Sequence, residues 1–169
     1  MINIEEIAVK WLRKALTETD SFDKFVYAWF AFNALYSENM SDRQGNSPNR
    51  NSELDAILLT VQNHVRLIDS RKRASLIVSD PVRFFESRVI RNMRNPNFDT
   101  SENHRRLKNS NSSERQKFEA LFKILYMVRC NLFHGNKLFD RDSDVTVIKN
   151  ASDVLTAYLT LVLGGKISS

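Results

Sequence analysis

Two residue types suited to phosphate chemistry lie near the end of one apolar segment. In the stretch YMVRCNLFHGNK, residues 126–137, Arg129 and His134 are five positions apart and a glycine follows. Histidine transfers protons near neutral pH because its ordinary pKa is about 6.5. A guanidinium keeps its charge and can make two charge-assisted hydrogen bonds to one phosphate group. Together the two side chains fit proton transfer at a phosphodiester.

Arg129 interrupts the apolar face of the helix that should carry it. Residues 113–134 predict a helix capped by Ser113, with an apolar stripe of Phe118, Leu121, Phe122, Leu125 and Leu132. Arg129 falls near the middle of this stripe. Burying an unpaired guanidinium costs several kcal/mol, so we expect Arg129 to be paired or to face a wet cleft.

A second apolar stripe is interrupted in the same way. In residues 22–36 the stripe consists of Phe22, Phe25, Val26, Trp29 and Tyr36. Asn33 sits in its middle, and we expect Asn33 to help hold Arg129. The alternative is that the two polar residues fix the register of the helices without doing chemistry, or that Arg129 reaches solvent from the end of its stripe.

His134 lies about 140° around the helix from Arg129. It shares its side with Met127, Cys130 and Asn131, and loosely with Lys123 and Ile124, which predicts a strip suited to contact with another chain. Across a two-fold axis, two such strips would bring both Arg–His pairs into one groove. The alternative is an ordinary surface histidine.

The elements around these residues read as an all-α fold, a single helical bundle of five to six helices. We expect helices over residues 4–17, 22–36, 52–68, 82–93, 113–134 and 152–165, with residues 74–78 continuing or restarting the third. Polar loops are expected at about 39–51 and 95–112. Gly135 suits a left-handed helix cap, and residues 1–169 read as one domain.

The composition argues against a membrane-spanning or secreted protein and against cysteine-based sites. No apolar run is long enough to span a membrane, and the N-terminus lacks the order of a signal peptide. The single cysteine, Cys130, excludes an internal disulfide and a cysteine-based zinc site. We therefore expect a cytoplasmic protein without a metal or cofactor.

The positive charge is concentrated in one part of the chain. Residues 66–108 carry eleven Lys/Arg and five Asp/Glu, against a net charge of +5 for the whole chain. We expect Arg88, Arg91 and Arg94 to align along one helix, with Arg105, Arg106 and Lys108 in the loop that follows. These side chains suit contacts to a nucleic-acid backbone. Phe84, Phe85 and Phe98 can stack on bases, although the first two are better explained as core residues.

Two segments resemble the HEPN superfamily. RCNLFH, residues 129–134, is similar to its R-x4-6-H motif at the four-residue spacing, and FVYAWFAFNALY, residues 25–36, resembles the aromatic second helix of HEPN proteins from prokaryotic defence systems. Family members often carry a polar residue directly after the arginine, where this chain has Cys130. Asn131 is the nearest substitute.

The resemblance implies a dimeric helical bundle and a metal-independent endoribonuclease, a toxin or anti-phage effector with an antitoxin or defence partner. On this interpretation Arg129 clamps the phosphate, His134 is the general acid or base, Asn131 assists them, and Asn33 and Cys130 support the site. The alternatives are a catalytically inactive HEPN module that binds a protein or nucleotide, and a plain helical nucleic-acid-binding domain.

Overall fold

A computed structural model describes residues 3–40, 52–95, 97–134 and 142–167. Every regular element in these residues is an α-helix, and one isolated antiparallel bridge joins Arg91 to Asp99. The eight helices are α1 (Ile4–Thr17), α2 (Ser21–Ser37), α3 (Glu53–Leu67), α4 (Ser70–Ile77), α5 (Asp80–Ser87), α6 (Ser101–Lys108), α7 (Glu114–Phe133) and α8 (Asp142–Ile167).

The described residues therefore contain more helices than the five to six expected. Part of the polar segment expected as a loop at 95–112 forms α6, and Asp69 caps α4 as a separate short helix. The helix expected over 82–93 is wrong in its bounds, because α5 ends at Ser87 and Arg88 is extended. α8 begins ten residues earlier than expected and passes through both of its glycines. Gly135, the expected cap, lies outside the described residues.

Local side-chain caps explain where most of these helices begin. The side chains of Asn3, Asp20 and Asp69 accept backbone N–H groups at the starts of α1, α2 and α4. Ser52 and Ser113 form reciprocal capping boxes at α3 and α7. Each such cap stabilises its helix by about 1 kcal/mol, and each acts within three residues, so it is readable from sequence.

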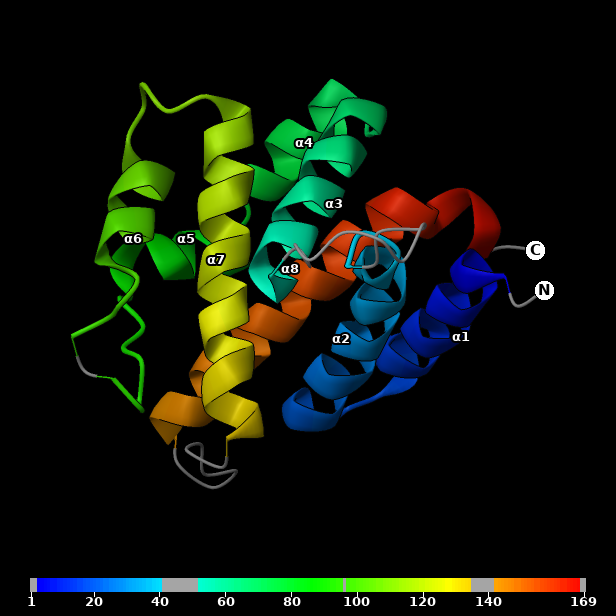
Figure 1. Ribbon diagram of the computed structural model, residues 1–169, viewed down its shortest axis with the longest axis horizontal. Coiled ribbons are helices and arrows are strands. Elements are labelled where there is room, and N and C mark those ends of the chain that lie inside the picture. The colour runs from blue at the N-terminus through cyan, green and yellow to red at the C-terminus, as the bar shows by residue number, and fades with distance from the viewer. Residues whose placement is uncertain (1–2, 41–51, 96, 135–141, 168–169) are drawn as a thin grey trace, which may run out of the picture.

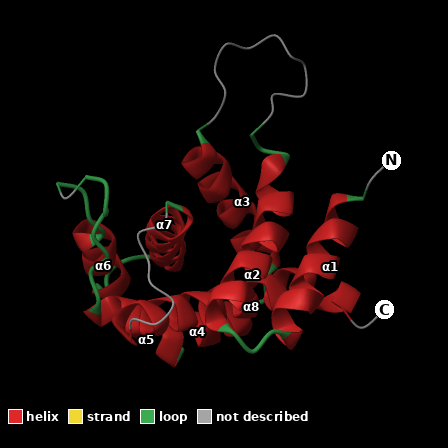
Figure 2. Ribbon diagram, turned by 90° about the horizontal axis from the view of Figure 1, so that it is seen from below, coloured by secondary structure: helices red, strands yellow, loops and turns green. Residues whose placement is uncertain are grey.

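The helices pack on both sides of α7 (Figure 1). Viewed along its axis in Figure 2, α7 lies between α6 on one side and α3 on the other. α8 runs behind α7 and reaches α1, and it contacts α1, α2 and α5 on the way. One cluster of buried apolar residues includes members from all eight helices.

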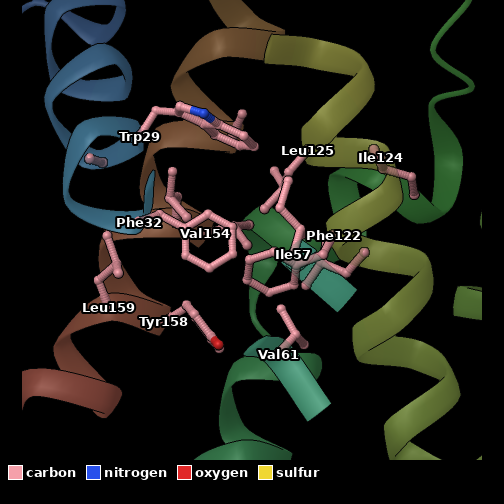
Figure 3. Packing of buried hydrophobic residues seen from close by; sticks show 14 of the residues in the cluster. Trp29, Phe32, Ile57, Val61, Phe122, Ile124, Leu125, Val154, Tyr158 and Leu159 are labelled. Atoms are coloured by element: carbon pink, nitrogen blue, oxygen red, sulfur yellow. The ribbon is translucent and has the colours of Figure 1, made fainter. Parts of the chain in front are cut away.

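Aromatic rings from three helices meet at the centre of this cluster (Figure 3). Phe32 of α2, Phe122 of α7 and Tyr158 of α8 are fully buried. The centroids of the Phe122 and Tyr158 rings are 4.5 Å apart, and those of Phe32 and Phe122 are 5.1 Å apart. Such edge and tilted contacts add to the burial of the rings. They fix the position of α7, and with it the position of Arg129.

Candidate functional site

Arg129 is held in an ion pair with Glu53, the first residue of α3. Its two terminal nitrogens, Nη1 and Nη2, lie 3.2 and 3.1 Å from the two carboxylate oxygens. Both side chains are 24% exposed, so the pair is largely shielded but still reaches the surface. Of the two expectations for Arg129, a charged partner or a wet cleft, the structure supplies the partner.

Two tyrosines complete the surroundings of the carboxylate. The hydroxyl of Tyr36 donates to Oε1 of Glu53 at 2.7 Å, and that of Tyr126 donates to Oε2 at 3.4 Å. Burial, and then the hydrogen bond to Glu53, raises the pKa of Tyr36. Burial first, and then the charges of Cys130 and Glu53, raises the pKa of Tyr126 to about 12. Both phenols therefore stay protonated at neutral pH and remain donors.

The guanidinium also lies among aromatic rings. Its central carbon, Cζ, is 5.8 Å from the centroid of Trp29, 5.9 Å from Tyr126 and 5.3 Å from Phe133. We call Trp29, Tyr36, Glu53, Tyr126 and Arg129 the arginine cluster. Within the described part of the chain, Nε of Arg129 and Nε1 of Trp29 are buried donors that find no acceptor. The cluster thus holds a cation in place by one carboxylate and by ring faces.

Asn33 does not take part in this cluster. The expectation that it faces the core and holds Arg129 is wrong, because its side chain is exposed. The buried face of α2 is centred on Trp29, Phe32 and Tyr36, and Asn33 lies about 100° beyond Phe32. Glu53 provides the contact expected of Asn33. It was missed because it lies 76 residues from Arg129 in the sequence and reads there as an ordinary first-turn acid.

His134 is exposed at the end of α7. Its Nδ1 lies 2.5 Å from the carbonyl oxygen of Cys130, one turn earlier. A carbonyl oxygen only accepts, so Nδ1 carries the proton. In the neutral ring this leaves the Nε2 lone pair as the basic site. Arg129 is bound to Glu53, about 140° around the helix, so one chain does not bring the two side chains together.

Asn131 is buried, with 3% of its surface exposed, and both ends of its amide are used. The oxygen Oδ1 accepts from the backbone N–H of Met93 at 3.1 Å. The nitrogen Nδ2 donates to the carbonyl of Arg91 at 2.8 Å. An amide so engaged is not placed to contact substrate. The direct catalytic role expected of Asn131 therefore finds no support in its hydrogen bonds.

The strip expected to meet another chain is partly covered by this chain. Ile124 is fully buried and Asn131 nearly so, since α6 and residues 91–93 pack on that side of α7. Met127 and Cys130 are half-buried. Cys130 is a free thiol, and its sulfur lies 4.0 Å from Nη1 of Arg129. Among the described residues at this end of α7, His134 and Phe133 are the exposed ones, and Phe133 is 44% exposed.

The residues expected to bind RNA lie on one side of α7, but not on one helix. Because α5 ends before them, Arg88, Arg91 and Arg94 do not align as helical neighbours. All three are exposed, in the segment between α5 and α6. The remaining three, Arg105, Arg106 and Lys108, are exposed on α6. Glu102 pairs with the two arginines, at 2.7 and 3.0 Å. Of the three aromatic residues, Phe85 is fully buried, Phe84 is half-buried against the core and Phe98 is exposed.

The described helices include none long and apolar enough to cross a membrane. Among the same residues, no three His, Cys, Asp or Glu side chains gather as metal ligands. Comparison of the chain with models of protein families, with curated proteins and with solved structures finds no match.

Proposed function

We propose that this chain is a metal-independent endoribonuclease of the HEPN type, acting as a toxin or anti-phage effector. The observation that carries the proposal is the end of α7. There a fixed guanidinium reaches the surface within two turns of an exposed imidazole whose protonated nitrogen is defined. Cleavage of RNA without a metal needs proton transfer and stabilisation of the phosphorane charge, which side chains of these two types can supply.

The guanidinium has donors left for a phosphate. Glu53 occupies one N–H on each terminal nitrogen, and a guanidinium has five N–H groups in all. The second N–H of Nη1 meets only the Cys130 sulfur, a weak acceptor at 4.0 Å. The second N–H of Nη2 can donate to a phosphate oxygen and stabilise the charge that develops on the phosphorane. Glu53 and the two tyrosines then act by holding Arg129 in one rotamer, which removes the cost of ordering it at the moment of reaction.

His134 supplies the proton transfer. The ribose 2′-oxygen attacks the adjacent phosphorus while its proton passes to Nε2 of one His134. The bond from phosphorus to the 5′-oxygen breaks, and a second imidazolium protonates that oxygen. The products are a 2′,3′-cyclic phosphate and a 5′-hydroxyl. The two proton transfers are divided between His134 of two copies of the chain.

The directions of the two side chains support a homodimer. Arg129 faces α2 and α3, whereas His134 projects from a different side of α7 into solvent. A two-fold axis near the end of α7 would place His134 of one copy beside Arg129 of the other. The exposed ring of Phe133, adjacent to the arginine cluster, supplies apolar surface for such a contact.

The second candidate is a catalytically inactive HEPN module that binds a protein or a nucleotide. The pairing of Arg129 favours it, because a guanidinium satisfied by a carboxylate that also accepts from two tyrosines can serve structure alone. On this reading the arginine cluster fixes the junction of α2, α3 and α7, and His134 is a surface residue.

The test is cleavage of labelled RNA in excess chelator by the wild type, Arg129→Ala and His134→Ala. Loss of a proton-transfer group lowers the rate by about 10²–10⁴-fold, and loss of a charge-stabilising donor by about 10²–10³-fold. Arg73→Ala is the matched control, because Arg73 is a similarly shielded arginine paired with Glu114. His104→Ala is the second control, because its Nδ1 also meets a backbone carbonyl.

Ribonuclease activity predicts cyclic-phosphate products, lost in both site variants and retained in both controls. Absence of cleavage by a folded wild-type protein, over a range of RNAs, would instead favour the inactive module. Equal losses in Arg73→Ala and Arg129→Ala would show that the arginine acts only through stability.

A further inference from the structure

The segment between α5 and α6 is an ordered loop closed at its base. The carbonyl of Ile90 accepts from the backbone N–H of Thr100 at 3.0 Å, and the Thr100 hydroxyl accepts from the N–H of Ile90 at 2.8 Å. Further along, the N–H of Asn92 donates to the carbonyl of Phe98 at 2.9 Å. We call residues 90–95 and 97–100 the basic loop. Its backbone is held well enough to present side chains in fixed positions.

Asn131 fastens the basic loop to α7. Its amide meets one N–H and one C=O of the loop, the pairing that a neighbouring β-strand would provide. Because the side chain is 3% exposed, these hydrogen bonds are shielded from competing water. Asn131 lies three residues before His134, so the loop is attached about one helical turn from the imidazole.

The loop and His134 lie toward the same side of α7. Asn131 and His134 are about 60° apart around the helix, whereas Asn131 and Arg129 are about 160° apart. Figures 1 and 2 both show the loop and α6 on one side of α7, and α2 and α3 on the other side. A strand lying against His134 therefore continues over the basic loop rather than over the arginine cluster of the same chain.

The loop exposes both of the groups that a single nucleic-acid strand needs. Phe98 is 62% exposed and Met93 is 51% exposed. Arg91 and Arg94 are exposed beside them, and Asp99 is the loop's acidic residue. An exposed ring offers a stacking face to a base, and the arginines offer charge to phosphates. A base inside a duplex is already stacked and cannot use that ring.

We propose that the basic loop is the subsite for unpaired nucleotides that flank the cleaved bond, and that Asn131 is the positioning residue that fixes it. The proposal rests on the proposed ribonuclease. Phe98 stacks on a base, Arg94 contacts a phosphate, and Asn131 sets their distance from His134. The substrate at this site is a single-stranded stretch of RNA.

Measurements of RNA affinity test the subsite independently of cleavage. In a His134→Ala background, the affinity for a labelled oligouridylate is compared with that for the same strand annealed to its complement. Phe98→Ala should weaken binding of the single strand roughly 5- to 150-fold, because stacking on one base is worth that factor. Arg94→Ala should lower the slope of log affinity against log salt by about 0.7. Phe30→Ala and Arg66→Ala, exposed residues on α2 and α3, are the matched controls.

Steady-state kinetics of an Asn131 variant test whether this residue positions the basic loop. In the proposed cleavage reaction, Asn131→Asp keeps the acceptor for Met93 but sets a carboxylate against the carbonyl of Arg91. We expect KM for the oligouridylate to rise more than KM for a dinucleotide, which is too short to reach the loop. Adding Asn131→Asp to Phe98→Ala should raise KM little further, since both act through the same contact.

Each result separates the subsite from the ribonuclease. Unchanged binding by Phe98→Ala, or equal affinity for the duplex, overturns the subsite even if the wild type cleaves RNA. Phe98-dependent binding by a protein that cleaves nothing supports the subsite and overturns the ribonuclease. An equal rise in KM for the dinucleotide and the oligouridylate in Asn131→Asp overturns the positioning role.

Discussion

Replacing Glu53 by glutamine removes the charge that faces Arg129 and keeps the shape of the side chain. Removing one partner of a fully buried ion pair costs about 3–5 kcal/mol, because the other charge is left uncompensated. Here both side chains are 24% exposed, and solvent screens part of the interaction. We therefore expect Glu53→Gln to lower the free energy of unfolding by about 2–3 kcal/mol.

A double-mutant cycle isolates the pair from the other roles of Glu53. Glu53 also lies in the first turn of α3, where a negative charge stabilises the helix by about 0.5 kcal/mol whether or not Arg129 is present. In an Arg129→Met background, Glu53→Gln should cost less than about 1 kcal/mol. The coupling energy should then be about 2 kcal/mol.

Urea unfolding followed by circular dichroism and by tryptophan fluorescence measures these differences. The control is Glu6→Gln, which breaks the Lys10–Glu6 pair on α1, whose side chains are 71% and 61% exposed. That change should alter stability by less than about 0.5 kcal/mol. If Glu53→Gln costs no more than Glu6→Gln, or costs the same with and without Arg129, then the ion pair does not hold the arginine cluster together.

The remaining predictions concern pH. Burial lowers the pKa of His64 to about 4, so below about pH 6.5 the unfolded chain binds a proton that the folded chain does not bind. The free energy of unfolding should therefore fall by up to about 3 kcal/mol toward pH 4. His64→Gln should flatten this pH profile when it is measured by urea unfolding. Burial raises the pKa values of Tyr36, Tyr126 and Tyr158, so above pH 10 these phenols lose their protons in the unfolded chain before they do in the folded chain. The free energy of unfolding should therefore fall by up to about 4 kcal/mol per pH unit. A shallow pH profile in alkaline urea titrations would contradict the burial of the three phenols.

Several features of this chain could be predicted from sequence because they depend on nearby residues. The capping residues Asp20, Ser52 and Ser113 start helices through hydrogen bonds that span at most three positions. The apolar spacing of α7 also predicts that Arg129 is drawn toward the core, and that it needs a partner there. Helical periodicity fixes which side chains share a face, and this holds whatever the helix packs against.

Packing decided what the arginine pairs with. In the sequence, Glu53 reads as an ordinary first-turn acid, and it meets Arg129 only because α3 packs near α2 and α7. Asn33 faces solvent because a face of α2 that includes Phe32 and Trp29 buries more apolar surface than the face that carries Asn33 would. Asn131 likewise lies close to Arg129 in sequence, but it points to the opposite side of α7, where the basic loop supplies a donor and an acceptor.

The sequence by itself determined the helical class, most helix starts and the need for a partner for an arginine on the apolar face of α7. Only the tertiary structure decided that the arginine is held by Glu53 and two tyrosines, and that Asn131 binds a loop. The physical reason is the distance along the chain over which each interaction acts. Caps and periodicity act over a few residues, whereas these hydrogen bonds join residues 17 to 76 positions apart. The distance along the chain carries no information about which polar groups meet.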